Sequence, residues 1–206
     1  MNFTITIIIF ITAYLLGSIN SALVVGKFYG NIDVRKHGSG NAGANNVLRV
    51  MGAKAALLVL LGDMLKGALA VVIAYIIAGG AERAALYTQL AGLGVVIGHN
   101  WPIFYEFKGG KGVVTSAAVV FMMNWKLVLI SLVFGIVIIA LTRYVSLASI
   151  TGSILFAVLA LFYDRKTLLF AVLLAALIIF RHRANIQRLF SGTESRLGQG
   201  SSSAGK

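Results

Sequence analysis

The sequence contains no cysteine, which excludes disulfide bonds and thiolate metal sites. Charged residues make up only 12% of the 206 residues, whereas ordinary soluble domains carry about 25%. The three histidines and six carboxylates are spread along the chain without the spacing of a metal-ligand cluster. The chain is therefore too apolar for an ordinary soluble protein, and we expect neither a metal nor another cofactor.

Long uncharged or nearly uncharged runs occupy most of the chain. They cover residues 1–26, 55–78, 84–98, 112–125, 127–142, 144–163 and 167–180. We interpret each run as a membrane span, because Lys and Arg at the ends of the short ones can reach the interface. The first run lacks the basic start of a secretory signal and is too long for its apolar core, so we expect it to be retained. The sequence predicts an all-α, polytopic integral membrane protein with seven transmembrane helices, although a re-entrant helix is the alternative for 112–125.

The distribution of positive charge predicts the orientation. With the N-terminus outside, thirteen of the 18 Lys and Arg residues fall on the inner side and four on the outer side, as the positive-inside rule requires. Losing one middle span would move the basic C-terminal segment to the opposite face. We therefore expect a cytoplasmic C-terminus. The net charge of +12 is explained by this orientation and by attraction to anionic lipid head groups, so no nucleic-acid partner is expected.

No hydrophilic stretch is long enough to fold separately, the longest internal one being 27–54. Residues 1–197 are therefore predicted to form a single membrane domain. Residues 198–206 read as a flexible polar tail or a remnant of cloning.

A first polar segment, residues 38–52, reads GSGNAGANNVLRVMG. Its glycines let backbone N–H groups approach an anion, its Ser and Asn side chains donate hydrogen bonds, and its arginine can bind a phosphate through a planar fork. The candidate residues are Gly38, Ser39, Gly40, Asn41 and Arg49. A merely flexible loop is the alternative. The GxGxxG spacing is accidental, because a membrane helix precedes it where a dinucleotide site needs a strand.

A second polar segment, residues 108–112, reads KGGKG and leads into an apolar run. A glycine-rich turn at a helix start exposes free N–H groups to an anion, and the lysines add charge. The candidates are Lys108, Gly109, Gly110, Lys111 and Gly112. The spacing does not match a nucleotide-binding Walker A loop, and an ordinary interfacial loop is the alternative. The preceding His99 is more typical of a structural histidine at a helix end.

A third polar segment, residues 181–196, reads RHRANIQRLFSGTESR. His182, Asn185 and Arg188 are three residues apart and would share one face if the last span continues as a helix. The alternative is an amphipathic basic anchor on the membrane surface. Within the second span, Asp63 and Lys66 are expected to form a structural ion pair.

Taken together, GSGNAGANNVLR, GHNWPIFYEFKGGKG and RHRANIQRLFSGTE resemble, in order and surroundings, the three motifs of the bacterial acyl-phosphate:glycerol-3-phosphate acyltransferases, the PlsY family. The resemblance covers nearly the whole chain, and TRYVSLAS at 142–149 is similar to a further family feature. Ala42 and Asn45 depart from the Pro and Thr expected of the first motif. This leaves the roles of those two positions open.

The resemblance implies transfer of a fatty acyl group from acyl phosphate to the sn-1 hydroxyl of glycerol 3-phosphate, giving lysophosphatidic acid and phosphate, by a monomer in the bacterial inner membrane. Ser39, Arg49, Lys111, His182 and Asn185 are the catalytic residues that it implies, with Glu194 as a structural acid. The substrate-binding set is Gly38, Gly40, Asn41, Asn46, Lys108, Gly109, Gly110, Gly112, Ser146 and Arg188. The general base is either His182 or a substrate phosphate.

Three rival functions also suit a basic membrane protein. A transporter of organophosphate anions would be expected to show internal repeats and polar breaks in mid-membrane, and none is visible. A metal-dependent lipid phosphotransferase needs more acidic residues at a suitable depth. A non-catalytic scaffold gives no reason for three segments rich in Gly, Ser and Asn.

Overall fold

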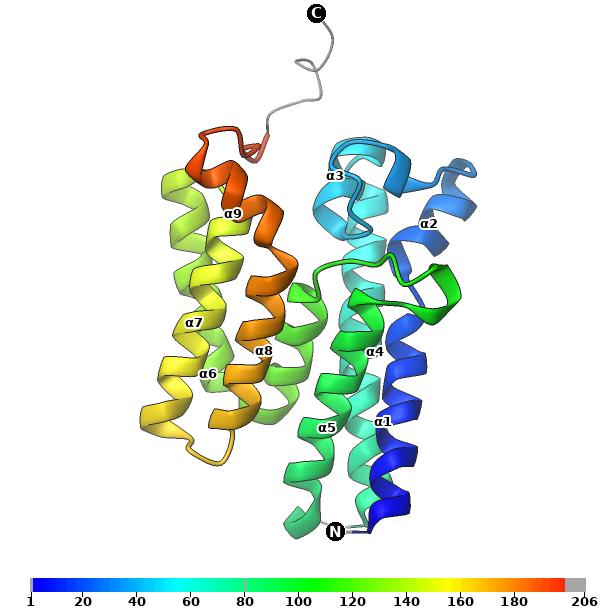
Figure 1. The fold of residues 1–206 in the computed structure, drawn as a ribbon, viewed down its shortest axis with the longest axis vertical. Coiled ribbons are helices and arrows are strands. Elements are labelled where there is room, and N and C mark those ends of the chain that lie inside the picture. Colours follow the sequence, from blue (N-terminus) through cyan, green and yellow to red (C-terminus); the bar gives the residue numbers. More distant parts are fainter. Residues whose placement is uncertain (1, 80, 199–206) are drawn as a thin grey trace, which may run out of the picture. The chain divides into compact units, whose positions relative to one another are not determined.

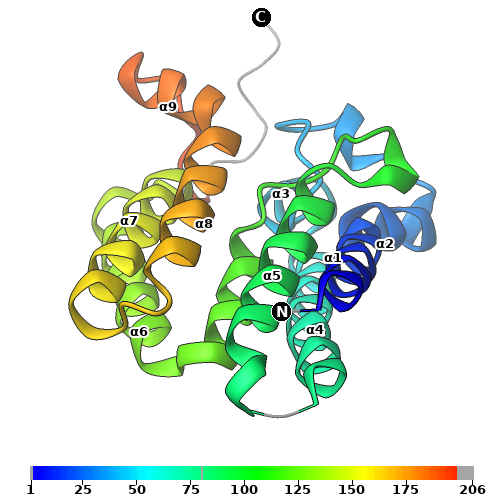
Figure 2. The same ribbon diagram turned by 60° about the horizontal axis from the view of Figure 1, so that its bottom comes forward.

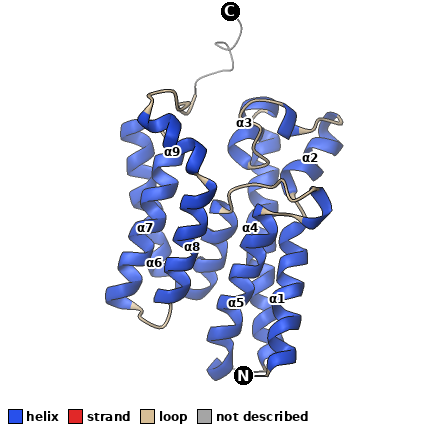
Figure 3. Ribbon diagram, viewed as in Figure 1, coloured by secondary structure: helices blue, strands red, loops and turns tan. Residues whose placement is uncertain are grey.

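The computed structural model describes residues 2–79 and 81–198, with no account of the side chains of residues 81–83. Every regular element in these ranges is helical, which confirms the all-α prediction (Figure 3). The helices are α1 (Phe3–Ser18), α2 (Ser21–Gly30), α3 (Ala44–Met51), α4 (Ala53–Ala78), α5 (Ala81–Asn100), α6 (Val113–Thr142), α7 (Val145–Tyr163), α8 (Leu168–Arg181) and α9 (Arg183–Phe190), with short 3-10 turns η1 (Val34–Lys36) and η2 (Ile103–Tyr105). Residues 199–206 of the predicted tail lie outside the described residues.

Four stretches of helix are long and apolar enough to cross a membrane: Phe3–Gly30, Ala53–Ala78, Val113–Thr142 and Val145–Tyr163. The bent pair α8 and α9 gives a fifth if it counts as one span. Large apolar side chains on α4, among them Leu57, Leu65 and Ile76, are exposed to the surroundings. Lipid is the solvent that such a surface requires.

Two helix breaks differ from the sequence prediction. The first uncharged run is interrupted after Ser18, because the Asn20 side chain accepts the Leu23 N–H at 3.0 Å and starts a new helix there. The runs 112–125 and 127–142 are joined in α6, whose backbone leaves helical geometry at Asn124 (φ −150°, ψ 81°) rather than at Lys126. The first break was not predicted, because the run 1–26 contains no charge that would mark it.

The chain divides into two compact units, Met1–Met123 and Asn124–Lys206. In the first unit, α1, α4 and α5 lie side by side (Figure 1). Glycines bring α1 and α5 close together, since a Cβ added at Gly17 would collide with the Val95 carbonyl and one added at Gly98 with the Tyr14 carbonyl. Small residues that allow such close backbone approach are typical of membrane helix pairs.

The polar segments of the first unit gather at one end of these helices, where α1 and α5 finish and α4 begins (Figure 1). A small apolar core lies beneath them. Its buried members are Ala22, Leu23, Val34, Ala42, Val47, Ala55, Ala56 and Val59, with Tyr105 packed against them. This core holds α2, α3 and η1 against α4.

The second unit contains α7, α8, α9 and the later part of α6 (Figure 2). At one end, the Asn124 amide donates to Asp164 Oδ2 at 3.0 Å, and the Thr167 hydroxyl donates to the same oxygen at 2.8 Å. These bonds tie the break in α6 to the turn between α7 and α8. At the other end lie α9 and the start of α7.

Candidate active site

The first polar loop, residues 31–43, is held in shape by one buried amide. The Asn46 side chain accepts the Ser39 N–H at 2.8 Å and donates to the Val34 and His37 carbonyls at 2.8 and 3.1 Å. Asn46 is 2% exposed, so water cannot replace these bonds. Asn46 was expected to bind substrate, and that role stays a prediction, but the structure shows its amide engaged with the loop backbone.

Gly38 and Gly40 have the left-handed φ values of 59° and 70° that favour glycine. A Cβ at Gly38 would also collide with the Asn46 amide oxygen. The loop presents Ser39 at its exposed tip. Arg49 lies partly exposed in the last turn of α3, and within the described part of the chain its guanidinium makes no ion pair or hydrogen bond. Both side chains are therefore available to a ligand.

The Asn46 clamp gives a stability prediction. Replacing Asn46 with Ala leaves the part-buried Ser39 N–H without its partner and removes a second donor from the Val34 and His37 carbonyls, which then keep the His37 and Gly40 N–H groups. We therefore expect a loss of about 1–3 kcal/mol in the free energy of unfolding. Asn45→Ala is the matched control, because Asn45 is exposed in the same helical turn. Thermal unfolding in detergent measures both variants, and equal midpoints would contradict the clamp.

The second polar loop, residues 101–112, packs against the end of α5. The Gly110 N–H donates to the His99 carbonyl at 3.0 Å, and a Cβ at Gly109 or Gly110 would collide with His99 atoms. A Cβ at Gly110 would also lie 2.9 Å from the Ala42 carbonyl of the first polar loop. Gly112 has φ 77° and ends the loop directly before α6. The expected glycine turn at a helix start is confirmed, and close packing explains its glycines.

Below the second polar loop lies a buried polar network. Lys66 Nζ lies 2.9 Å from Asp63 Oδ1, which confirms the structural pair expected within the second span. Lys66 Nζ also donates to the Gly17 and Ile19 carbonyls at 3.2 and 3.0 Å, and it lies 2.9 Å from His99 Nδ1. His99 is 3% exposed. The network therefore joins the break after α1 to the residue on which the glycines pack.

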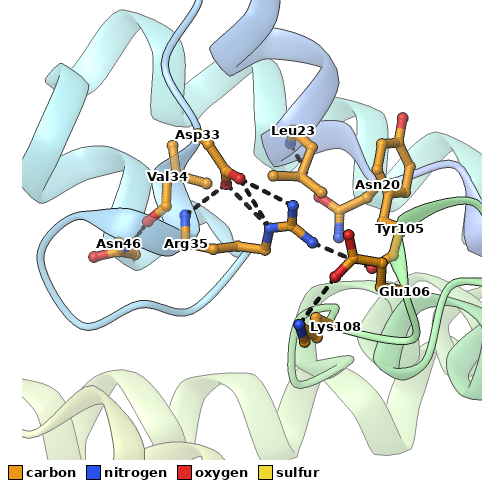
Figure 4. Close-up of polar contacts among 9 residues, drawn as sticks. All are labelled: Asn20, Leu23, Asp33, Val34, Arg35, Asn46, Tyr105, Glu106 and Lys108. Atoms are coloured by element: carbon orange, nitrogen blue, oxygen red, sulfur yellow. Dashed lines mark hydrogen bonds and ion pairs between the residues drawn. The ribbon is translucent and has the colours of Figure 1, made fainter.

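A contact between the two loops involves residues that sequence reasoning did not select (Figure 4). Arg35 forms a two-pronged ion pair with Asp33, and its Nη1 donates to the Tyr105 carbonyl at 3.1 Å. The hydrogen bond from Arg35 holds the pKa of Asp33 below its ordinary value. Lys108 pairs with Glu106 at 2.9 Å, and both side chains are largely exposed. The spacing of Asp33 and Arg35 was visible in the sequence, but their partner lies seventy residues away.

In the second unit, Glu194 collects three hydrogen bonds. Its Oε1 accepts from Ser146 Oγ at 2.7 Å and from Asn185 Nδ2 at 2.6 Å, and its Oε2 accepts from Arg188 Nε at 2.7 Å. The structure thus brings together three predicted site residues around the acid that the resemblance marked as structural. Glu194 fixes which way the Asn185 amide points.

The continuing helix expected through the third segment is wrong. The chain bends by 61° between α8 and α9, and His182 lies at the bend. His182 Nδ1 lies 2.8 Å from the Ile178 carbonyl, which can only accept a hydrogen bond, so Nδ1 carries the proton. In the neutral ring, Nε2 is then the basic nitrogen.

The Glu194 cluster predicts a pH dependence. Partial burial would raise the pKa of Glu194, but the hydrogen bonds from Ser146, Asn185 and Arg188 outweigh it and lower the pKa. A folded-state pKa below the unfolded one means that the carboxylate stabilises the fold above about pH 4.5, and that this stabilisation is lost as the pH falls through the folded-state pKa. Glu194→Gln should lower the unfolding midpoint at pH 7 and flatten its acid dependence.

The control for this prediction is Glu106→Gln, which removes an exposed ion pair that solvent screens. Thermal midpoints from pH 7 down to about pH 4 compare the two variants with the parent. Identical curves for Glu194→Gln and the parent would contradict a stabilising role for the cluster.

The predicted site residues divide between the two units. The first holds Ser39, Asn41, Arg49 and the KGGKG segment, and the second holds Ser146, His182, Asn185 and Arg188. Among the described residues, no group of three or more His, Cys, Asp or Glu side chains could hold a metal ion.

Known proteins resemble this chain over nearly its whole length. The family model for glycerol-3-phosphate acyltransferase matches residues 7–192. Relatives of that name include one from Thermoanaerobacter sp. (strain X514), 51% identical over 92% of this chain and 94% of its own length. Another, from Clostridioides difficile (strain 630), is 42% identical over 94% of this chain and 96% of its own length.

Two solved structures are similar over nearly the whole chain. The crystal structure of PlsY (YgiH), an integral membrane glycerol 3-phosphate acyltransferase, in its glycerol 3-phosphate form is 42% identical, with a TM-score of 0.84 over 94% of this chain and 96% of that one. Its lysophosphatidic acid form is 41% identical, with a TM-score of 0.82 over 94% and 95%. Together with the apolar helices, these likenesses show a multi-pass membrane protein. The chain belongs to the glycerol-3-phosphate acyltransferase family.

Proposed function

We propose that this protein transfers a fatty acyl group from acyl phosphate to the sn-1 hydroxyl of glycerol 3-phosphate. The observation that carries the proposal is the contact between the two polar loops, where Gly110 packs against the Ala42 carbonyl. This contact brings together, in one unit, two glycine-rich segments that carry Arg49, Lys108 and Lys111. Two substrates that each carry a phosphate need two such anion sites, and the solved relative has a glycerol 3-phosphate form and a lysophosphatidic acid form.

The proposed reaction is a single acyl transfer. The sn-1 oxygen of glycerol 3-phosphate attacks the acyl carbonyl carbon and forms an ester bond, while the bond from that carbon to the phosphate oxygen breaks. The hydroxyl proton goes to a base, and lysophosphatidic acid and inorganic phosphate leave. Since acyl phosphate is already activated, positioning supplies much of the rate, with effective molarities of about 10⁵ M or more for well-oriented groups.

In this proposal, Lys108, Lys111 and Arg49 neutralise the phosphates. The oxyanion that develops on the acyl carbonyl is stabilised by Ser39, Asn185 or loop N–H groups. The remaining predicted binding residues shape the site: Gly38, Gly40, Asn41 and Asn46 in the first segment, Gly109, Gly110 and Gly112 in the second, and Ser146 and Arg188 beside Glu194. No metal or cofactor takes part.

The proton acceptor is His182 or a substrate phosphate. The bond from Nδ1 to the Ile178 carbonyl supports His182, because it leaves Nε2 unprotonated in the neutral ring. His182→Ala separates the two. Turnover reduced by about 10² or more, with an altered pH profile, supports the histidine, whereas near-normal turnover at every pH assigns the proton to the phosphate.

We further propose seven membrane spans in a monomer, with the N-terminus outside, the C-terminus in the cytoplasm and the site facing the cytoplasm of a bacterial inner membrane. The distribution of Lys and Arg supports this orientation. The end of the first unit that carries both polar loops would then face the cytoplasm. Glycerol 3-phosphate, a water-soluble substrate, would reach the loops from that side.

The purified protein, given labelled glycerol 3-phosphate with either acyl phosphate or acyl-CoA, tests the function. Labelled lysophosphatidic acid from acyl phosphate alone supports the proposal. Product from acyl-CoA alone overturns the donor assignment. Failure to form product from any donor, with the fold intact, overturns the function and favours transport of an organophosphate.

A further inference from the structure

We propose that Arg35 is a positioning residue that fixes the second polar loop for phosphate binding, acting through the Tyr105 carbonyl. The inference rests on the proposed function, in which Lys108 and Lys111 of that loop bind a phosphate. Arg35 lies outside the loop that carries these lysines, on the 3-10 turn η1 of the first polar loop. It therefore connects two segments that must keep one geometry.

The guanidinium of Arg35 is held in a fixed plane. Its Nε and Nη2 lie 3.0 and 2.9 Å from the two Asp33 carboxylate oxygens, and Asp33 Oδ1 also accepts the Arg35 backbone N–H at 3.0 Å. When one edge of the planar guanidinium is bound, the direction of its remaining N–H donors is fixed as well. One of them, Nη1, reaches the Tyr105 carbonyl at 3.1 Å (Figure 4).

The carbonyl that Arg35 holds belongs to an unusual turn. The next two residues, Glu106 and Phe107, both have left-handed φ values, 57° and 58°. This conformation is uncommon for residues other than glycine, and it persists where surrounding contacts impose it. The Glu106 to Lys108 ion pair is exposed and contributes little. The bond from Arg35 is a contact from outside the turn that opposes its relaxation.

The same carbonyl leads directly to the phosphate-binding residues. Tyr105 O accepts both Arg35 Nη1 and the Lys108 N–H, the latter at 3.1 Å. Arg35 and Lys108, the first residue of KGGKG, thus donate to the same carbonyl oxygen. If the turn relaxes, Lys108 and the glycines after it shift from the geometry that receives the phosphate. Binding of glycerol 3-phosphate should weaken more than the chemical step.

Two conservative variants separate positioning from a direct charge contact. Arg35→Lys keeps the positive charge but loses the planar guanidinium. Asp33→Asn keeps Arg35 but weakens the ion pair that orients its guanidinium. Positioning predicts that each raises the KM for glycerol 3-phosphate by about tenfold, with kcat changed by less than about threefold. A direct contact between Arg35 and phosphate predicts that Asp33→Asn leaves KM unchanged or lowers it, because a nearby negative charge is removed.

Steady-state kinetics of the purified protein, with the thermal midpoint of each variant, provide the test. Lys36→Gln is the control, since it removes an exposed cation next to Arg35 and should leave KM within about twofold. Adding Phe107→Gly to Arg35→Lys should recover much of the lost affinity, because glycine adopts the left-handed turn without strain.

The proposal is overturned if Asp33→Asn leaves KM at the parent value, if both variants lose kcat alone, or if both fail to fold. An inactive parent protein would instead overturn the proposed function, so the two failures are distinguishable.

Discussion

Replacing Lys66 with Met is expected to destabilise the protein by about 3–5 kcal/mol, because it leaves the buried Asp63 carboxylate without its cation. Both side chains of the pair are almost fully buried, at 5% and 3% exposure. The same substitution removes the donor to the Gly17 and Ile19 carbonyls at the break after α1. Unfolding in detergent micelles measures the loss.

Two further variants show whether the charge is the cause. Lys54→Met removes an exposed lysine from the first turn of the same helix and should change stability by less than about 0.5 kcal/mol. Asp63→Asn combined with Lys66→Met removes both charges and should recover more than half of the loss. If Lys66→Met matched Lys54→Met, the buried pair would not stabilise the fold.

The second large effect is catalytic. Ser39→Ala is expected to lower turnover by about 10²- to 10³-fold, the usual cost of losing one donor to a developing oxyanion. Stability should hardly change, because the Ser39 side chain is exposed and the bond to Asn46 uses its backbone N–H. Initial rates with saturating acyl phosphate and glycerol 3-phosphate measure the effect.

Ser191→Ala is the matched control, an exposed serine whose hydroxyl makes only local contacts with Arg188 and Thr193 among the described residues. It should keep near-parent turnover. A Ser39→Ala enzyme that turns over as fast as Ser191→Ala would remove Ser39 from the chemistry and leave Asn185 and the loop N–H groups as oxyanion donors.

Periodic and compositional features of the sequence predicted the fold class and the polar segments well. Four stretches of helix that are long and apolar enough to cross a membrane coincide with the predicted apolar runs, and a bent helix pair gives a fifth if it counts as one span. The Asp63 to Lys66 spacing correctly indicated an ion pair, because residues three apart face each other on a helix. The turn before α6 was also correctly expected from KGGKG. These features depend on neighbours within a few residues.

Features that depend on tertiary contacts were missed. The sequence does not show whether an asparagine points toward substrate or toward its own loop, as with Asn46. Nor does it show that Arg35 reaches the Tyr105 carbonyl, or that the chain bends at His182 instead of continuing as one helix. The short helix α3 was not predicted, because the Gly and Asn content of its segment is typical of a loop.

The most direct test of the account uses the absence of cysteine from the chain. Single cysteines replace exposed residues in the three polar segments (Asn45, Lys108 and Ser191) and at two of the positions expected outside (Lys126 and Lys166). A membrane-impermeant maleimide added to intact cells should label the two outer positions, and the three polar segments should react only after the membrane is opened. Labelling of Asn45→Cys, Lys108→Cys and Ser191→Cys from different sides would contradict a shared cytoplasmic site.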